Sequence, residues 1–327
     1  MSSSSPERVG DVSEAELLAR LLPVLSGGEE VRLGPGDDAA LLELGATAVV
    51  TTDSMVAGVD WRDDWSSPQD VAAKLLVSNL ADIAAMGATT QAILLSLMVD
   101  PDSPLDWTIE FAAGMGEQCR RYGVAVAGGD LSAAPTGVRV ASVTALGSLG
   151  DQAPVTRSGA RPGDAVAVTG PLGRSGVGLA LLIGAADAEA VAALPAEALA
   201  HHRRPSCPLS QGPAGAAAGA RAMIDISDGL LRDAERVALA SGVAIAIDSQ
   251  RLGADLNWAE RYLPRAQARA CVLGGGEEHS LLAAFPPESG APPWWRVIGE
   301  ARDGSGLLLD DRPAAAAGWD HFAGRPA

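Results

Sequence analysis

Acidic residues recur in this chain where an apolar segment gives way to a turn. The segments are GPGDDAALL (34–42), AVVTTDSMV (48–56), VAVAGGDLS (124–132) and AMIDISDGL (222–230). Taken singly, an aspartate beside a glycine is more often a turn former or a helix N-cap than a ligand. Burying several carboxylates together costs on the order of several kcal/mol unless cations neutralise them. The repeated pattern therefore predicts coordination of a hard metal ion by oxygen atoms.

A fifth acidic segment, LLVSNLADIAAMG (75–87), has the pattern of a helix. Its Asn79 and Asp82 are three residues apart and therefore share one helix face. Magnesium binds through one or two carboxylates and also takes up substrate phosphate oxygens. A magnesium site would thus allow a nucleotide to bind to a chain whose formal net charge is −17. Such a site can transfer phosphoryl groups by positioning and charge neutralisation alone.

Composition excludes several other functions. The negative charge disfavours nucleic acid, whose phosphates need a basic surface. Lys74, the only lysine, does not lie in G-x-x-x-x-G-K-[ST], so there is no P-loop, and the four histidines form no His-x-x-x-His pair. The apolar runs are far shorter than the ~18 residues of a membrane helix, and the polar N-terminus has no apolar signal core. We expect a cytoplasmic protein with three reduced, structural cysteines, Cys119, Cys207 and Cys271.

Three further polar features have more than one interpretation. Arg157, in TRSGARPGD, would either fork onto a nucleotide phosphate or pair with Asp164. Asp228 is a plausible N-cap for the helix predicted to follow it, and it could also be a metal ligand. The glycine-rich run TGPLGRSGVGLALL lacks a G-x-G-x-x-G in frame, so it predicts a strand-to-helix turn with Ser175 near the helix start.

The elements that must position these residues alternate between strands and helices. In the first half the sequence predicts strands at 46–52, 91–99, 124–127 and 138–149, and helices at 13–26, 68–86 and 105–122. In the second half it predicts strands at 165–169, 222–226, 243–248 and 280–285, with helices between them and a loop at 286–295. The polar break at TRSGARPGD divides the chain into an N-terminal tail and helix (1–30), a first domain (31–155) and a second domain (156–327). The fold class expected is α+β, with mixed layers in two domains.

The order of these motifs resembles that of the thiamine-monophosphate kinase family. The matching segments are GPGDDAALL, TTDSMVAGVDW, KLLVSNLADIAAMGA, GGDLS, TRSGARPGD, VTGPLGRS, DISDGLLRD and LGGGEEHSLL, which span nearly the whole chain. The family belongs to the superfamily of aminoimidazole ribonucleotide synthetase. The resemblance implies a two-domain fold of that superfamily and a homodimer in which the N-terminal sheets pair. It also implies that ATP phosphorylates thiamine monophosphate to thiamine diphosphate with the help of several Mg²⁺ ions.

The same resemblance implies roles for individual residues. The magnesium positions are Asp38, Thr51, Thr52, Asp53, Asp82, Asp130, Asp225 and Asp228. Among these, Asp53, Asp130 and Asp228 are the expected catalytic residues. The nucleotide-contacting positions are Gly129, Asp130, Arg157 and Ser227. The positions that contact thiamine are Asp60, Glu277 and Trp319, and an aromatic face at the last of these suits a flat, cationic thiazolium ring.

Two departures from the family pattern lie on the substrate side. Asp60 in GVDW stands where the family commonly has histidine, and GGEEHSL places His279 and Ser280 where it commonly has tyrosine and glutamate. Two alternatives therefore stay open. One is an ATP-using enzyme of the same superfamily with a different acceptor. The other is a non-catalytic relative that binds nucleotide or metal. Neither nucleic acid nor a membrane is expected as a partner.

Overall fold

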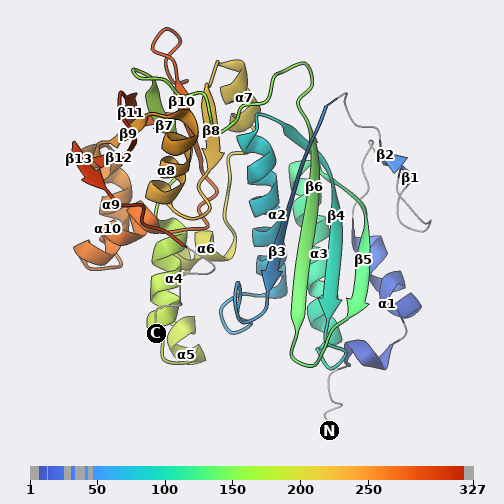
Figure 1. The fold of residues 1–327 in the computed structure, drawn as a ribbon. Coiled ribbons are helices and arrows are strands. Elements are labelled where there is room, and N and C mark those ends of the chain that lie inside the picture. Colours follow the sequence, from blue (N-terminus) through green and yellow to red (C-terminus); the bar gives the residue numbers. More distant parts are fainter. Residues whose placement is uncertain (1–6, 13, 26–30, 34–40, 43–46, 320–327) are drawn as a thin grey trace. The chain divides into compact units, whose positions relative to one another are not determined.

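The computed structural model describes residues 7–12, 14–25, 31–33, 41–42 and 47–319. The chain divides into two compact units, which we call the N-terminal unit (Met1–Ile83 and Thr90–Gly150) and the C-terminal unit (Ala84–Thr89 and Asp151–Ala327). In each unit helices pack on a β-sheet (Figure 1), so the expected α+β class with layered domains is confirmed.

The N-terminal unit contains a four-stranded sheet. Its strands, in order across the sheet, are β3 (Ala48–Val56), β6 (Arg139–Ser148), β4 (Thr89–Val99) and β5 (Ala125–Ala133). β3 and β6 are antiparallel, whereas β4 and β5 are parallel. The other described elements before β3 are η1 (Val9–Asp11), α1 (Glu14–Leu21), η2 (Leu22–Val24) and the paired short strands β1 (Val31–Leu33) and β2 (Leu41–Leu42).

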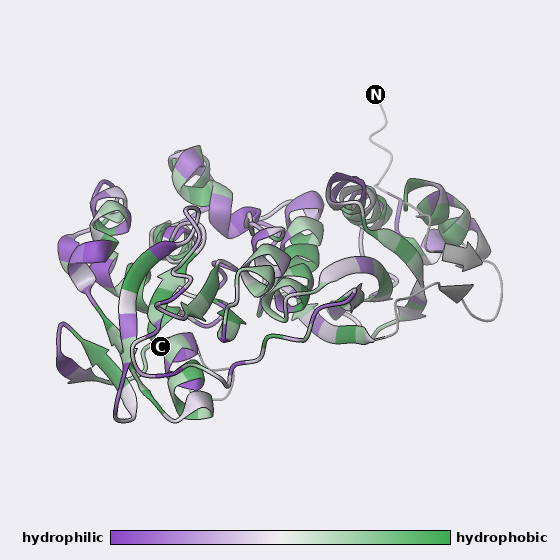
Figure 2. Cartoon of the chain, turned by 90° about the horizontal axis from the view of Figure 1, so that it is seen from above, coloured by the Kyte–Doolittle hydropathy of each residue, from purple (hydrophilic) through white to green (hydrophobic). Residues whose placement is uncertain are grey.

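Two long helices, α2 (Pro68–Ala85) and α3 (Leu105–Tyr122), lie along one face of this sheet (Figure 1). α3 makes the crossover that a parallel β4–β5 pair requires. It ends at Gly123, which takes the left-handed φ of 68° that glycine tolerates at a helix C-terminus. In β6, fully buried residues alternate with partly exposed ones, and Figure 2 shows hydrophobic and hydrophilic bands along the strands. In β6 the helix-covered side is therefore apolar, whereas the uncovered side carries both polar and apolar residues.

The C-terminal unit contains a seven-stranded sheet. Its strand order is β13 (Arg312–Ala314), β12 (Gly306–Leu309), β9 (Ala244–Ile247), β11 (Arg296–Arg302), β7 (Ala165–Val168), β10 (Leu281–Phe285) and β8 (Ala222–Asp225). The helices are α4 (Arg174–Gly184), α5 (Ala188–Ala192), α6 (Ala196–Arg203), α7 (Gln211–Ala217), α8 (Leu230–Ser241), η3 (Ser249–Leu252), α9 (Gly253–Ala259) and α10 (Arg265–Gly274). β8, β9 and β10 are buried along their whole length, and β7 is buried except at Ala165. Residues of these strands form the main core of this unit together with residues of α8 and α10.

Three strands of this sheet, β11, β12 and β13, are not predicted by the sequence pattern. β11 carries three charged residues and is only partly buried, and its register shifts between Val297 and Gly299. β12 and β13 pair through a turn at Asp310 and Asp311, whose φ values are 53° and 62°. Two successive left-handed residues are typical of a tight hairpin, but the usual signals are Asn-Gly or Asp-Gly. An Asp-Asp pair does not give that signal.

The positions of two aspartates differ from the expectation that the acids follow strands. Asp53 lies inside β3 and Asp130 inside β5, because both strands continue for three residues beyond the aspartate. β3 and β5 are the two edges of the sheet, where exposed polar side chains are tolerated. Asp225 is the last residue of β8, as expected.

Two further expectations concern the membrane and the cysteines. Over the described ranges, no helix is both long and apolar enough to cross a membrane. Cys119, Cys207 and Cys271 are free, and the first two are buried. Burial raises the pKa of the Cys119 thiol to about 12, so it behaves as an apolar core residue.

Candidate functional site

A first polar group of the N-terminal unit lies where β3 meets α2. The Thr51 hydroxyl donates a hydrogen bond of 2.8 Å to Asp82 Oδ2. Because side chains alternate along a strand, Thr51 and Asp53 share the face that α2 covers, opposite the fully buried Ala145 and Val143 of β6. The structure therefore brings together three of the residues expected at the magnesium site.

Thr52 has the opposite orientation from Thr51. Its hydroxyl donates to the Val143 carbonyl oxygen at 3.0 Å and accepts from Thr144 Oγ1 at 3.1 Å. Thr52 therefore contributes to the pairing of β3 with β6 on the face that the helices leave uncovered. The nearby Asn79 is fully buried, and its Oδ1 has no hydrogen-bond partner.

Asp130 is separated from these residues by the width of the sheet. It lies in β5, at the other edge from β3, and pairs in register with Ser96 on the uncovered face. Three strand spacings of about 4.8 Å place the two edges roughly 14 Å apart. Asp53 and Asp130 of one chain therefore cannot coordinate the same ion. The Asp130 carboxylate accepts a hydrogen bond of 2.8 Å from Ser132 Oγ.

Gly129, beside Asp130, has a reason of its own to be glycine. A Cβ atom at this position would lie 1.8 Å from the Leu95 carbonyl oxygen in β4. That distance is far inside any van der Waals contact, so a side chain here would push β4 and β5 apart. At Gly128 the nearest atom to a Cβ would be Leu94 Cδ2, at an ordinary 3.6 Å.

In the C-terminal unit a second group of acids surrounds the turn after β8. Asp225 is 3% exposed, and its Oδ2 lies 3.3 Å from Nδ1 of the buried His279. Asp228 is not the N-cap of α8, because Gly229 occupies that position. The Asp228 carboxylate instead pairs with Arg236 at 2.5 Å. The backbone N–H groups of Asp228 and Gly229 donate to the buried Asp233, so Asp233 orders this turn.

Asp233 is a buried acid beside the candidate site, and the sequence pattern does not single it out. It is fully buried, and its burial, together with the nearby Asp225 carboxylate, raises its pKa to about 7. Arg236 and the backbone donor at Asp228 oppose this shift. The repeated aspartates in DISDGLLRD carry a sequence signal, but only the fold distinguishes a buried acid from an exposed one.

The loop 274–280 lies against the same turn. The Glu277 N–H donates to the Ser227 carbonyl at 2.7 Å, and the His279 N–H donates to the Ile226 carbonyl at 2.8 Å. The C-terminal segment joins them, because the Trp319 N–H donates to the Asp228 carbonyl at 2.9 Å. Trp319 keeps 41% of its surface exposed. Four expected site residues, Ser227, Asp228, Glu277 and Trp319, are thereby brought together in this unit.

Two of the remaining expected residues lie elsewhere. In the N-terminal unit, the Asp60 carboxylate accepts a hydrogen bond of 2.7 Å from the Val56 N–H, which closes the turn after β3. In the C-terminal unit, Arg157 is exposed. Its possible partner Asp164 is fully buried and pairs with Arg221 at 2.7 Å. Asp38 lies outside the described residues.

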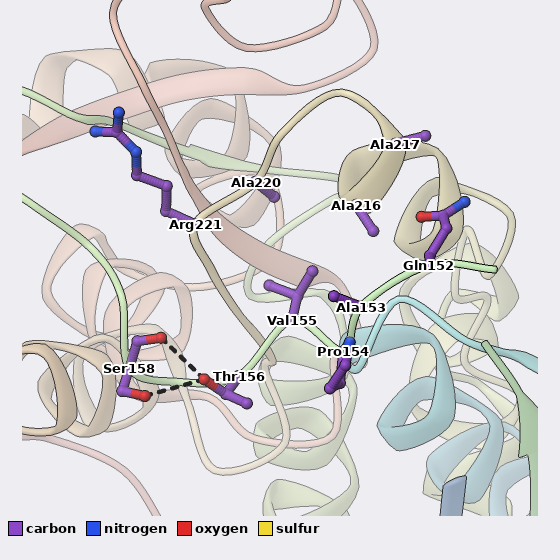
Figure 3. Close-up of a pocket in the computed structure, with 10 residues that line it drawn as sticks. All are labelled: Gln152, Ala153, Pro154, Val155, Thr156, Ser158, Ala216, Ala217, Ala220 and Arg221. Atoms are coloured by element: carbon purple, nitrogen blue, oxygen red, sulfur yellow. Dashed lines mark hydrogen bonds between the residues drawn. The ribbon is translucent and has the colours of Figure 1, made fainter. Parts of the chain in front are cut away.

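The residues on either side of Arg157 line a surface pocket of about 480 Å³ (Figure 3). In this pocket the Thr156 hydroxyl is bonded to Ser158, as the dashed lines show. The pocket's cation, Arg221, is already paired with two carboxylates, Asp164 and Glu288. The pocket itself therefore does not provide an unneutralised cation for a phosphate.

The residues expected to bind metal share one donor chemistry but lie in different places. Within the parts of the chain that the structure describes, no three His, Cys, Asp or Glu side chains form a group that could hold a metal ion. The expected ligands are all carboxylate or hydroxyl oxygens, which is the donor chemistry that Mg²⁺ prefers. They are distributed over both edges of one sheet and over both units. The donor type fits magnesium, although among the described residues the expected ligands do not form one group within either unit.

Comparison with known proteins identifies the family. Residues 36–149 match the N-terminal domain, and residues 161–306 the C-terminal domain, of AIR synthase related proteins. Thiamine-monophosphate kinase of Mycobacterium tuberculosis is 41% identical over 302 residues, which cover 89% of this chain and 86% of that protein.

Solved structures agree with the sequence matches. Thiamine-monophosphate kinase from Stenotrophomonas maltophilia has a TM-score of 0.78 and 32% identity, covering 92% of this chain and 96% of that one. A structure described as AaThiL complexed with AMPPCP and TMP has a TM-score of 0.73 and 28% identity, covering 98% of this chain and all of that one. The chain therefore belongs to the thiamine-monophosphate kinase family, within the AIR synthase related proteins.

Proposed function

We propose that this chain transfers the γ-phosphoryl group of ATP to thiamine monophosphate and releases thiamine diphosphate and ADP. The observation that carries the proposal is the similarity, over 98% of the chain, to a structure that holds both AMPPCP and TMP. The 41% identity to a thiamine-monophosphate kinase supports the same activity. The acceptor phosphate is already an anion at neutral pH, so its oxygen can attack the γ-phosphorus without a strong general base.

The acidic residues would hold magnesium. Asp53, Asp82 and Thr51 are grouped at the β3–α2 contact, and Asp225 and Asp228 flank the turn after β8. Asp130 and Asp38 belong to the same proposed set. When bound, Mg²⁺ neutralises the charge of the phosphates and of the transition state. Asp53, Asp130 and Asp228 are the carboxylates whose removal we expect to reduce turnover most.

Separate groups would bind the nucleotide and the thiamine. We assign Gly129, Asp130, Arg157 and Ser227 to the nucleotide, because backbone N–H groups and an exposed guanidinium suit phosphate. We assign Asp60, Glu277 and Trp319 to thiamine monophosphate. The last two flank the same turn, and an exposed indole beside a carboxylate suits a cationic thiazolium ring.

We also propose that the protein acts as a homodimer whose N-terminal sheets pair. The face of the four-stranded sheet that α2 and α3 leave uncovered exposes Val50, Leu94 and Met98. Exposed apolar residues grouped on one sheet face favour contact with another protein surface. Asp130 lies on this face, far from Asp53 of the same chain, so a second copy would supply the missing half of each metal site. A cytoplasmic location fits the use of ATP.

The direct test is to incubate the purified protein with Mg²⁺, ATP and thiamine monophosphate and to measure thiamine diphosphate by chromatography. Formation of thiamine diphosphate and ADP in equal amounts supports the proposal. ADP release only with another phosphorylated acceptor would favour a changed acceptor pocket. Asp60 and His279 motivate the possibility of another acceptor, because both depart from the family pattern. His279 also contacts Asp225. Nucleotide binding without any ADP release would contradict catalysis altogether.

A further inference from the structure

A buried polar cluster in the C-terminal unit contacts the carboxylate of Glu277. Ser175 Oγ lies 3.4 Å, and His202 Nδ1 lies 3.3 Å, from the same carboxylate oxygen, Oε2. Ser175 Oγ and His202 Nδ1 are themselves 3.0 Å apart. Ser175 and His202 are 1% and 6% exposed, whereas a third of the Glu277 side chain is accessible. Two buried groups therefore hold one oxygen of a carboxylate that reaches the surface.

The fold places this pair by bringing two helices unusually close. Ser175 is in the first turn of α4, and His202 is in the last turn of α6. A Cβ atom at Gly178 of α4 would lie 2.7 Å from His202 Cβ, so only glycine lets the helices approach this closely. His202 thereby enters the interior with its ring nitrogen directed at the α4 N-terminus.

The loop backbone is fixed at the same point. Glu277 takes a left-handed φ of 60°, which a side-chain-bearing residue adopts only when its surroundings enforce it. The next residue, Glu278, is 1% exposed, and its Oε1 accepts a hydrogen bond of 2.7 Å from the Ser175 N–H. His201 Nε2 donates to the Glu278 backbone carbonyl oxygen at 3.1 Å. The start of α4 therefore anchors two successive loop residues.

We propose that Ser175 and His202 are positioning residues that hold the Glu277 carboxylate in one orientation for the cationic ring of thiamine monophosphate. The inference rests on the proposed kinase function and on the proposed contact of Glu277 with substrate. An unrestrained glutamate side chain samples several rotamers, and fixing it before binding removes part of the entropy cost of binding.

The chemistry of the contact defines the informative variants. A carboxylate only accepts hydrogen bonds, so the His202 nitrogen that contacts it must be the Nδ1–H form, and the serine hydroxyl is the second donor. Asparagine places an N–H donor close to the position of Nδ1, whereas leucine fills similar space without a donor. His202→Asn should therefore retain the function that His202→Leu loses.

The experiment compares the wild type with His202→Leu, His202→Asn and Ser175→Ala. KM and kcat are measured for thiamine monophosphate at saturating ATP and for ATP at saturating thiamine monophosphate. Glu197→Gln is the matched control, since it removes an exposed ion pair from the same helix. We expect His202→Leu and Ser175→Ala to raise the KM for thiamine monophosphate about five- to tenfold and to leave the KM for ATP unchanged. His202→Asn should restore most of the affinity.

A double-mutant cycle decides whether His202 acts through Glu277. In a Glu277→Gln background, His202→Leu should add almost nothing to the increase in KM. Additive effects, or a rise in both KM values with a lower Tm, would overturn the inference. If the wild type makes no thiamine diphosphate, the proposed function fails instead. Crystal structures of the two His202 variants then decide the pairing: a Glu277 side chain unmoved in His202→Leu refutes it, and one displaced there but retained in His202→Asn supports it.

Discussion

Replacing Gly129 by alanine tests whether this glycine is required by the sheet or by the nucleotide. The added Cβ would lie 1.8 Å from the Leu95 carbonyl oxygen and 2.8 Å from its carbon. Overpacking costs about 1–3 kcal/mol and occasionally more, and here the obstacle is backbone, which cannot rotate away. We therefore expect Gly129→Ala to lower the free energy of unfolding by about 3 kcal/mol. At roughly 2–4 °C per kcal/mol, Tm should fall by about 6–12 °C.

Gly128→Ala is the matched control, because it adds the same atom one residue earlier. Its Cβ would meet only Leu94 Cδ2, at 3.6 Å, so the change in stability should stay within about 1 kcal/mol. Urea denaturation and thermal melts give the two stabilities, and fluorescence titration with an ATP analogue gives the two affinities. A Gly129→Ala protein that melts like Gly128→Ala but no longer binds nucleotide would refute the steric argument and assign the glycine to phosphate contact.

Three further substitutions test other contacts. Burial raises the pKa of Glu278 well above its usual 4.5, because it disfavours the charged carboxylate. The stability that comes from the protonated Glu278 is therefore fully present below pH 4.5 and is lost as pH rises through the folded-state pKa. In urea titrations from pH 4.5 to 8, the free energy of unfolding of Glu278→Gln should therefore fall less steeply with pH than that of the wild type. The two slopes should differ by at most about 1.4 kcal/mol per pH unit, and parallel profiles would contradict this. Thr51→Val removes the hydrogen bond to the α2 carboxylate and should cost about 1 kcal/mol, whereas Thr51→Ser should not; equal stabilities would count against the bond. Asp164→Ala leaves Arg221 without its buried partner and should cost about 3–5 kcal/mol, against less than about 1 kcal/mol for Glu288→Ala, the exposed partner of the same guanidinium.

The sequence predicts the strands and helices that are apolar and bounded by glycine or proline. β7 to β10 and helices α2 and α3 follow the expected ranges closely, because their burial imposes a clear pattern. β11 to β13 are short, charged or joined by an Asp-Asp turn, and such strands are stabilised by neighbours that are distant in sequence. Only the pairing of β11 with β7 and β9 makes its residues a strand.

The candidate site was also predicted only in part from the sequence. Thr51 and Asp82 are adjacent, as the shared chemistry suggests, but the sequence could not place Asp53 and Asp130 on opposite edges of one sheet. Strand order is a property of long-range pairing, so a motif list gives the ligand types without the distances between them. The roles of Ser175 and His202 were also inaccessible, because their proximity depends on the close packing of α4 against α6.

The carboxylates after β8 are already partly neutralised by the protein itself. Arg236 and Arg232 both approach Asp228 at Oδ2, at 2.5 and 3.9 Å, and His279 approaches Asp225 at Oδ2. The positive charge of an arginine so close to one carboxylate oxygen partly cancels the negative charge of the turn. Any cation bound at Asp228, as proposed above, would share this carboxylate with Arg236. This pairing explains how two aspartates three residues apart can lie close to the buried Asp233.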